Sequence, residues 1–225
     1  RGRPVRLVAV SKYQPVDAIR AAYDHGQRHF GENYIQELTD KAPQLPDDIA
    51  WHFIGAIQRN KVKRLVRVPN LAVVETVDSV KLAQALNDAV EQERGMGADG
   101  AEAPAAALRV YVQVNTSDEP NKNGVAPAEA AALATYVHTQ CPHLRVVGLM
   151  TIGAAQHSHA GGANPDFERL VACRAALAAH PALRDAAPPV AQWALSMGMS
   201  ADFEAAIQCG ATSVRVGSEI FGRRP

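Results

Sequence analysis

The segment Leu7-Val8-Ala9-Val10-Ser11-Lys12, near the start of the 225-residue chain, decides the fold. Its Val-rich apolar part predicts a short buried strand of the kind found in parallel sheets. The strand ends at Lys12, and Pro15 then introduces a segment with helical spacing of apolar residues that ends near Gly26. The chain therefore opens with a strand and a helix, and a lysine stands at the carboxyl end of the strand.

The same alternation of strand and helix continues along the chain. Further strands are predicted at 29–31, 51–54, 71–74, 108–114, 146–150, 192–195 and 213–216, with helical patterns between them. Two Gly-rich stretches, 95–107 and 153–164, are predicted as loops. Eight strands alternating with helices, without a shift in composition, predict one (β/α)₈ TIM barrel domain over residues 1–225. A doubly wound open sheet is disfavoured because no G-x-G-x-x-G follows the first strand.

Composition excludes several partners. Lys and Arg together number 23, as do Asp and Glu, so the chain lacks the basic surplus that nucleic acid or an acidic membrane surface requires. The three cysteines form no C-x-x-C pair, which indicates buried thiols in a reducing compartment. No membrane-length apolar run or signal peptide is visible, so we expect a cytoplasmic protein. The abrupt start predicts a missing upstream segment, which leaves an organellar location open.

Polar residues gather at the predicted strand ends, which form the active face of such a barrel. A lysine partly desolvated at a strand end has a lowered pKa and can form a Schiff base with an aldehyde. The alternative for Lys12 is a strand simply emerging into solvent. Reading the ends in order gives Lys12, Glu32, Asn33, His52, Thr76, Asn115, Met150, Thr151, Ser196, Gly198, Arg215, Gly217 and Ser218.

The last two strand ends predict a phosphate site. Barrels often bind phosphate with the loops after strands seven and eight, here predicted at 196–200 and 217–218. Glycines let backbone N–H groups approach an anion, hydroxyls add donors, and the following helix favours negative charge. Each loop alone reads equally as an ordinary turn with a capping serine. Two such loops in these places favour a phosphate.

A Schiff-base lysine, with a phosphate site across the barrel mouth, suits pyridoxal 5'-phosphate. Arg215 lies two residues before Gly217 and is predicted either to reach the pyridine nitrogen or to form an ion pair at the mouth. In the first case it would keep the nitrogen unprotonated and weaken the ring as an electron sink. A barrel that binds a keto sugar phosphate through Lys12, as an aldolase would, is a further alternative.

The sequence also resembles the pyridoxal-phosphate homeostasis protein family over nearly its whole length. The resemblance rests on 9–12 (AVSK), 30–34 (FGENY), 52–55 (HFIG), 148–151 (GLMT), 195–202 (LSMGMSAD) and 215–218 (RVGS). It implies a barrel like the alanine racemase N-terminal domain, with pyridoxal phosphate held on Lys12 as an internal aldimine. It also implies phosphate contacts from Ser196, Gly198, Gly217 and Ser218, with Asn33 and Met150 near the ring. The chain departs from the family in lacking the helix that usually precedes the first strand.

Two functions remain open at this point. The leading hypothesis is a monomeric carrier that holds pyridoxal phosphate in vitamin B6 homeostasis and delivers it, with apo pyridoxal-phosphate enzymes as recipients. The alternative is a pyridoxal-phosphate-dependent racemase or related enzyme, which needs an acid or base on each face of the substrate carbon. Tyr13 and Tyr34 are predicted as packing residues rather than that second group. No residue is therefore assigned a catalytic role, and His157 and His159 without carboxylate or thiol partners predict no metal site.

Overall fold

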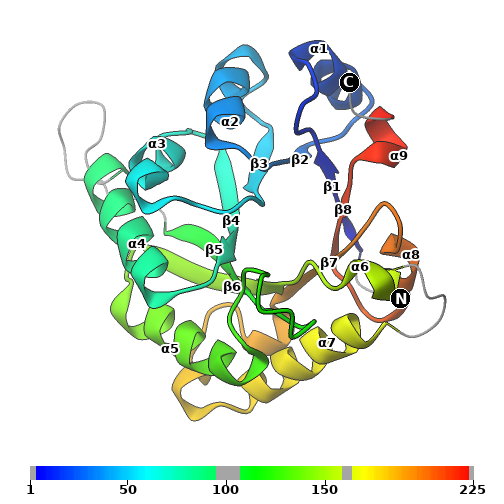
Figure 1. The fold of residues 1–225 in the computed structure, drawn as a ribbon. Coiled ribbons are helices and arrows are strands. Elements are labelled where there is room, and N and C mark those ends of the chain that lie inside the picture. Colours follow the sequence, from blue (N-terminus) through cyan, green and yellow to red (C-terminus); the bar gives the residue numbers. More distant parts are fainter. Residues whose placement is uncertain (1–3, 95–106, 159–163, 223–225) are drawn as a thin grey trace.

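A closed barrel of parallel strands forms the centre of the molecule in the computed structural model, which describes residues 4–94, 107–158 and 164–222 (Figure 1). Each strand pairs in parallel with its neighbours in chain order, and β8 returns to pair with β1, where Ala9 lies opposite Val216. The strands are β1 Arg6–Val10, β2 His29–Glu32, β3 Ala50–Phe53, β4 Leu71–Val77, β5 Leu108–Gln113, β6 Leu144–Met150, β7 Ala194–Met199 and β8 Ser213–Val216. The predicted TIM barrel is confirmed.

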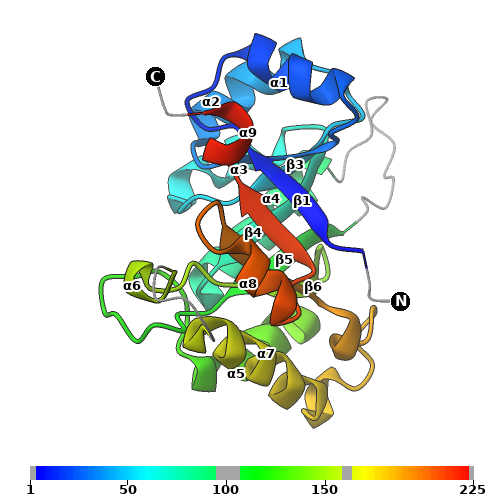
Figure 2. The ribbon, with the colours of Figure 1, turned by 90° about the vertical axis from the view of Figure 1, so that its right-hand side faces the viewer.

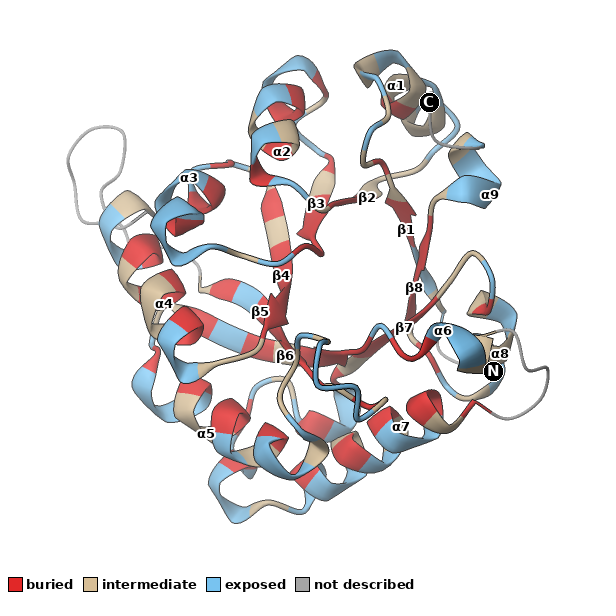
Figure 3. Cartoon of the chain, viewed as in Figure 1, coloured by how far each residue is buried: buried red, intermediate tan, exposed pale blue. Residues whose placement is uncertain are grey.

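Helices surround the barrel and cover its outer face (Figures 1 and 2). They are α1 Val16–Asp24, α2 Ile35–Lys41, α3 Val62–Val66, α4 Val80–Arg94, α5 Ala130–Gln140, α6 Ala155–Ser158, α7 Pro165–Ala178, α8 Phe203–Gln208 and α9 Ser218–Phe221. Their buried residues face the strands, and their exposed residues face outward (Figure 3). The apolar spacing in the sequence produces this arrangement, because residues three or four apart share one face of a helix.

Local signals set several helix ends. Pro165 stands at the first turn of α7, where its missing N–H costs nothing, and the Asn164 side chain accepts a 3.0 Å hydrogen bond from the backbone N–H of Asp166. Gly26 has a φ of +96° just after α1, which stops the helix as predicted. The buried thiols of Cys141 and Cys173 confirm the expectation for two of the three cysteines.

Two element predictions were wrong. Residues 196–199 were predicted as a turn, but they form the second half of β7, because Ser196 pairs with Met150 on one side and Ser213 on the other. Within the predicted loop 153–164, residues 155–158 form the short helix α6. The predicted loop 95–107 lies outside the described residues apart from Ala107.

Candidate functional site

A cavity of about 410 Å³ opens at the carboxyl end of the barrel. It is lined by six of the eight residues predicted for the cofactor site, namely Lys12, Asn33, Met150, Arg215, Gly217 and Ser218. These residues come from segments that follow or end β1, β2, β6 and β8. The barrel therefore brings together, at one mouth, residues that lie up to 206 positions apart in the sequence.

Lys12 lies in a tight turn after β1. The backbone N–H of Gln14 donates to the Ser11 carbonyl at 3.0 Å, and Tyr13 between them has a φ of +63°. A left-handed conformation is costly for a residue with a side chain and needs support from its surroundings. The support comes from Glu37 of α2, whose Oε2 accepts a 2.8 Å hydrogen bond from the Tyr13 N–H.

Lys41 fixes the other side of the same turn. Its buried ammonium donates to the Ser11 carbonyl at 2.9 Å, to Glu32 Oε1 at 2.8 Å and to Glu37 Oε2 at 2.6 Å. The Ser11 hydroxyl also donates to Glu32 Oε1, at 2.8 Å. Burial raises the pKa of Glu32, although its contacts with Lys41 and Ser11 oppose that rise. Both neighbours of Lys12 are thus held by one charged cluster behind the strand.

The segments after β7 and β8 meet beside Lys12. The Gly217 N–H donates to Ser200 Oγ at 3.2 Å, and the Met199 N–H donates to Asp202 Oδ1 at 2.7 Å. Helix α9 begins at Ser218, and the first amides of a helix have no partners within it. Ser200, Gly217 and Ser218 therefore form a rim of hydroxyl and amide donors on the cavity.

The sequence predicted a phosphate site across the mouth from Lys12. The rim lies instead next to Lys12. The barrel closes by pairing β1 with β8, so the ends of these two strands are neighbours. A Cβ added to Gly217 would lie 3.3 Å from the Val10 carbonyl oxygen. A closed (β/α)₈ barrel places its last strand beside its first, so the rim belongs next to Lys12.

Ser196 and Gly198 do not line this cavity, although both were predicted to contact phosphate. Both lie within β7 rather than in the loop after it. Gly198 has a φ of +91°, and a Cβ there would lie 2.5 Å from the Cβ of Ala206 in α8. Gly198 therefore lets α8 pack closely on the strand, and Ser196 faces the barrel interior.

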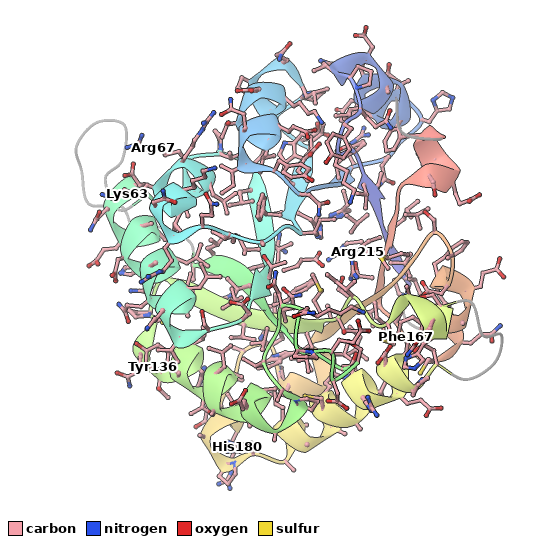
Figure 4. All side chains as sticks on the ribbon, in the orientation of Figure 1. Lys63, Arg67, Tyr136, Phe167, His180 and Arg215 are labelled. Carbon is pink, nitrogen blue, oxygen red and sulfur yellow. The ribbon has the colours of Figure 1, made fainter. Side chains whose placement is uncertain are left out.

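Arg215 reaches the interior side of the cavity from β8 (Figure 4). Its Nη1 donates to Ser196 Oγ at 2.6 Å, and its Nη2 donates to the Thr151 carbonyl at 2.7 Å. Burial lowers the pKa of Arg215, while nearby Glu75 and Asp202 oppose that shift. Hydrogen bonds to Ser196 and Thr151 hold the Arg215 side chain in place. The ion pair at the mouth, which was the alternative prediction, does not hold it.

A buried chain of hydrogen bonds continues downward from Arg215. The Ser196 hydroxyl donates to Glu75 Oε2 at 2.6 Å, and His52 Nδ1 lies 2.5 Å from Glu75 Oε1. Burial opposes ionisation of Glu75, but the contacts with His52, Arg215 and Ser196 outweigh it and hold its pKa below the usual value. Glu75 therefore balances the buried charge of Arg215. His52 lies inside the barrel and not at the mouth where the sequence placed it.

Comparison with known proteins gives the family. The model for the N-terminal domain of alanine racemase matches residues 2–225. The chain belongs to that family. It is 50% identical to the pyridoxal phosphate homeostasis protein of Bos taurus, over 97% of this chain and 77% of that one. Identity to the human protein of the same name is 46%, over 97% of this chain and 76% of that one. The resemblance to the pyridoxal phosphate homeostasis family is therefore confirmed.

Solved structures support the same assignment. The structure of PipY from Synechococcus elongatus with PLP bound has a TM-score of 0.75 and 32% identity, covering 97% of this chain and 92% of that one. Alanine racemase from Corynebacterium glutamicum has a TM-score of 0.65 at 18% identity, covering 98% of this chain and 57% of that one. The second match shows the shared barrel fold.

The residues that line the cavity at the carboxyl end of the barrel fit pyridoxal phosphate. The cavity combines a primary amine, a rim of anion donors and the apolar side chains of Ile54, Met150 and Ile152. Asn33 Oδ1 is buried there and has no hydrogen-bond partner among the described residues. An unpaired buried polar atom is costly, so a ligand or water that donates to Asn33 would relieve it. The donor set thus offers a place for each part of the cofactor.

Other candidates lie elsewhere. Tyr13 and Tyr34, predicted to be packing residues, are exposed and contact each other, with ring centroids 5.4 Å apart and hydroxyls 2.5 Å apart. Lys122 donates hydrogen bonds to Glu119 Oε1 and to the Gly153 carbonyl. Within the described part of the chain there is no group of three or more metal-ligating side chains. No described helix is long and apolar enough to cross a membrane.

Proposed function

We propose that the chain binds pyridoxal 5'-phosphate at the carboxyl mouth of the barrel and acts as an intracellular carrier of this cofactor. One observation carries the proposal: the Lys12 amine and the donor rim of Ser200, Gly217 and Ser218 line one cavity. Relatives named pyridoxal phosphate homeostasis protein, and PipY with PLP bound, support the choice of ligand.

Each residue takes a role that follows from its chemistry. The cofactor supplies an aldehyde that condenses with a primary amine, with release of one water molecule. Lys12 provides that amine, and the rim donates hydrogen bonds to the phosphate. Asn33 and Met150, which line the cavity, would flank the ring, and Arg215 would face the ring nitrogen as a cation that disfavours its protonation. Ser196 and Gly198 act indirectly, the first by holding Arg215 and the second by shaping the β7–α8 connection.

The composition of the cavity lining favours a carrier over an enzyme. Among the described residues that line it there is no Tyr, His, Cys, Asp or Glu. Lys12 and Arg215 are its ionisable residues, and an arginine stays protonated at neutral pH. Racemisation needs a proton donor or acceptor on both faces of the substrate carbon. Only Lys12 is able to exchange a proton there, so the lining supplies one face.

Two assays test this proposal. Wild type mixed with pyridoxal phosphate should gain a visible absorbance band that Lys12→Ala lacks, while Lys63→Ala, on the exposed side of α3, keeps it. Loaded protein should then activate an apo pyridoxal-phosphate enzyme faster than free release of the cofactor allows. Absence of the band from wild type would overturn the binding claim. Rapid solvent-deuterium exchange at the α-carbon of alanine would overturn the carrier claim in favour of the racemase.

Three finer statements belong to the same proposal. We expect the protein to be a monomer, because the proposed site uses residues of one chain. We expect recipients to be apo enzymes that use pyridoxal phosphate, since these are the proteins that consume the cofactor. We expect a cytoplasmic location, which agrees with the free thiols of Cys141, Cys173 and Cys209. Residues 1–225 are proposed to form one domain around this site.

A further inference from the structure

The amino end of the barrel holds a second cavity, of about 470 Å³, away from the Lys12 mouth. Its walls come from residues at the starts of strands. Arg6 opens β1, Arg109 is the second residue of β5, and Arg145 is the second residue of β6. Arg6, Arg109 and Arg145 are named here the arginine triad. All three line the cavity and are exposed to solvent.

Two members of the triad are direct neighbours across the sheet. Arg109 and Arg145 are paired in the register of β5 and β6. Adjacent strands lie about 4.8 Å apart, so the two side chains start from nearly the same place. Like charges directly opposite each other destabilise a sheet. A ligand of opposite charge would remove that repulsion.

Nothing among the described residues neutralises the triad. No Asp or Glu lines the cavity, and none of the three arginines forms an ion pair in the described part of the chain. Arg109 Nε donates to the Ala72 carbonyl at 3.0 Å, which leaves its two terminal nitrogens for other acceptors. A guanidinium offers five N–H donors in a planar fork that matches phosphate and carboxylate.

The inner end of the cavity is polar, and burial together with the positive charge of the triad lowers the pKa of a histidine beside it. His52 and Tyr111 are buried there, and His29 Nδ1 lies 3.0 Å from His52 Nε2. Burial first, and then the charges of Arg6, His52 and Arg109, lower the pKa of His29 to about 4. His29 is therefore uncharged at neutral pH, and the arginine triad supplies positive charge to the walls of this cavity.

We propose that this amino-end cavity binds a small organic anion that carries two or more phosphate or carboxylate groups. Three cations from β1, β5 and β6 suit a multivalent ligand better than a single charge. The volume of the cavity accommodates a metabolite-sized molecule and not an extended polymer. The inference uses no residue of the Lys12 cavity and does not depend on the function proposed for that site.

Isothermal titration with inorganic pyrophosphate tests the proposal. Both the unloaded protein and protein saturated with pyridoxal phosphate are titrated, because the rim at Ser200 and Gly217 also offers anion donors. We expect one pyrophosphate site to remain in the loaded protein, with inorganic phosphate at least about tenfold weaker. Arg109→Gln with Arg145→Gln should weaken pyrophosphate at least about tenfold, which is about 1.4 kcal/mol.

A matched control separates this site from general charge. Lys63→Gln with Arg67→Gln removes two exposed charges, one from α3 and one from the residue after it (Figure 4), and should leave the affinity within about twofold. Equal weakening by both double variants, or no pyrophosphate binding at millimolar concentration, would overturn the proposal. If the triad variant fails to fold, the single change Arg145→Gln decides, with weakening of at least about threefold expected and an unchanged affinity contradicting the site.

Failure of the cofactor proposal gives a different result. In that case pyridoxal phosphate produces no absorbance band, and the titration of the unloaded protein with the same variants still tests the amino-end cavity. If loading with pyridoxal phosphate abolishes pyrophosphate binding, the anion binds at the Lys12 mouth. That result would contradict the amino-end site.

Discussion

The backbone N–H of Tyr13 donates a 2.8 Å hydrogen bond to Oε2 of Glu37, and this bond holds the residue after Lys12 in a left-handed conformation. The same carboxylate accepts from Lys41 at 2.6 Å, and Lys41 donates to the Ser11 carbonyl. Helix α2 thus fixes the backbone on both sides of Lys12. Precise placement of a reactive group depends on such a supporting shell.

Glu37→Ala should therefore weaken the binding of pyridoxal phosphate without unfolding the protein. The turn loses the acceptor for the Tyr13 N–H, so Lys12 samples more positions. We expect affinity to fall about threefold to tenfold, or roughly 0.7–1.4 kcal/mol. Titration followed by absorbance measures it. Glu93→Ala removes a partly buried carboxylate that pairs with exposed Arg67, far from the turn at Lys12, and should leave the affinity unchanged. An equal loss in both variants would contradict a positioning role for Glu37.

Glu75→Gln should strongly destabilise the barrel. The carboxylate is fully buried between His52 and Ser196, and it balances the charge of buried Arg215. Removing one partner of a buried charge pair costs about 3 kcal/mol or more. Urea unfolding at neutral pH measures this cost. Glu93→Gln breaks an exposed pair and should cost less than about 1 kcal/mol, so similar values for the two variants would refute the balancing role of Glu75.

Gly198→Ala should cost more than Gly210→Ala. Both glycines have positive φ, +91° and +100°, so an alanine is strained at either site. That strain is worth about 1 kcal/mol. A Cβ at Gly210 meets no atom within 4 Å, whereas one at Gly198 meets Ala206 at 2.5 Å. We expect the clash to add about 1–3 kcal/mol in urea unfolding. Equal losses would mean that β7 and α8 are not closely packed there.

His29 should account for part of the loss of folding stability at acid pH. Its pKa falls from 6.5 to about 4 in the folded state, so the unfolded chain binds the extra proton. Its contribution to stability is therefore complete above pH 6.5 and is lost as the pH falls from 6.5 toward 4. Between pH 7 and pH 5, the urea midpoint of wild type should fall further than that of His29→Gln. His138→Gln, exposed on α5, serves as the control, and a wild-type loss matched by His29→Gln would contradict this assignment.

Patterns along the chain predicted the barrel and most of the cofactor cavity. Lys12 and Gly217 were identified because each follows a predicted strand, whereas the family resemblance implied the place of Asn33 near the ring. β7 was predicted too short because Ser196, Gly198 and Ser200 have the composition of a turn, while pairing with β6 and β8 makes residues 194–199 a strand. Ser200 lies in the motif 195–202 but was not predicted as a site residue. Ser196, the first serine of that motif, was predicted in its place.

Interior contacts had no signal in the sequence. Glu75 and Ser196 are 121 residues apart, and their hydrogen bond depends on barrel closure. Arg109 lies within the predicted strand 108–114 and Arg145 just before the predicted strand 146–150, and the register of β5 and β6 makes them neighbours. Side-chain alternation predicts which face a residue occupies, but not which distant residue shares it.

Borohydride reduction followed by peptide mass spectrometry tests the central claim most directly. Wild type saturated with pyridoxal phosphate is reduced, digested and searched for lysines that carry the reduced cofactor. We predict one stoichiometric label, on the peptide containing Lys12, and no label at that level on any lysine of Lys12→Ala. A stoichiometric label on another lysine, or an unlabelled Lys12 in saturated wild type, would contradict the account.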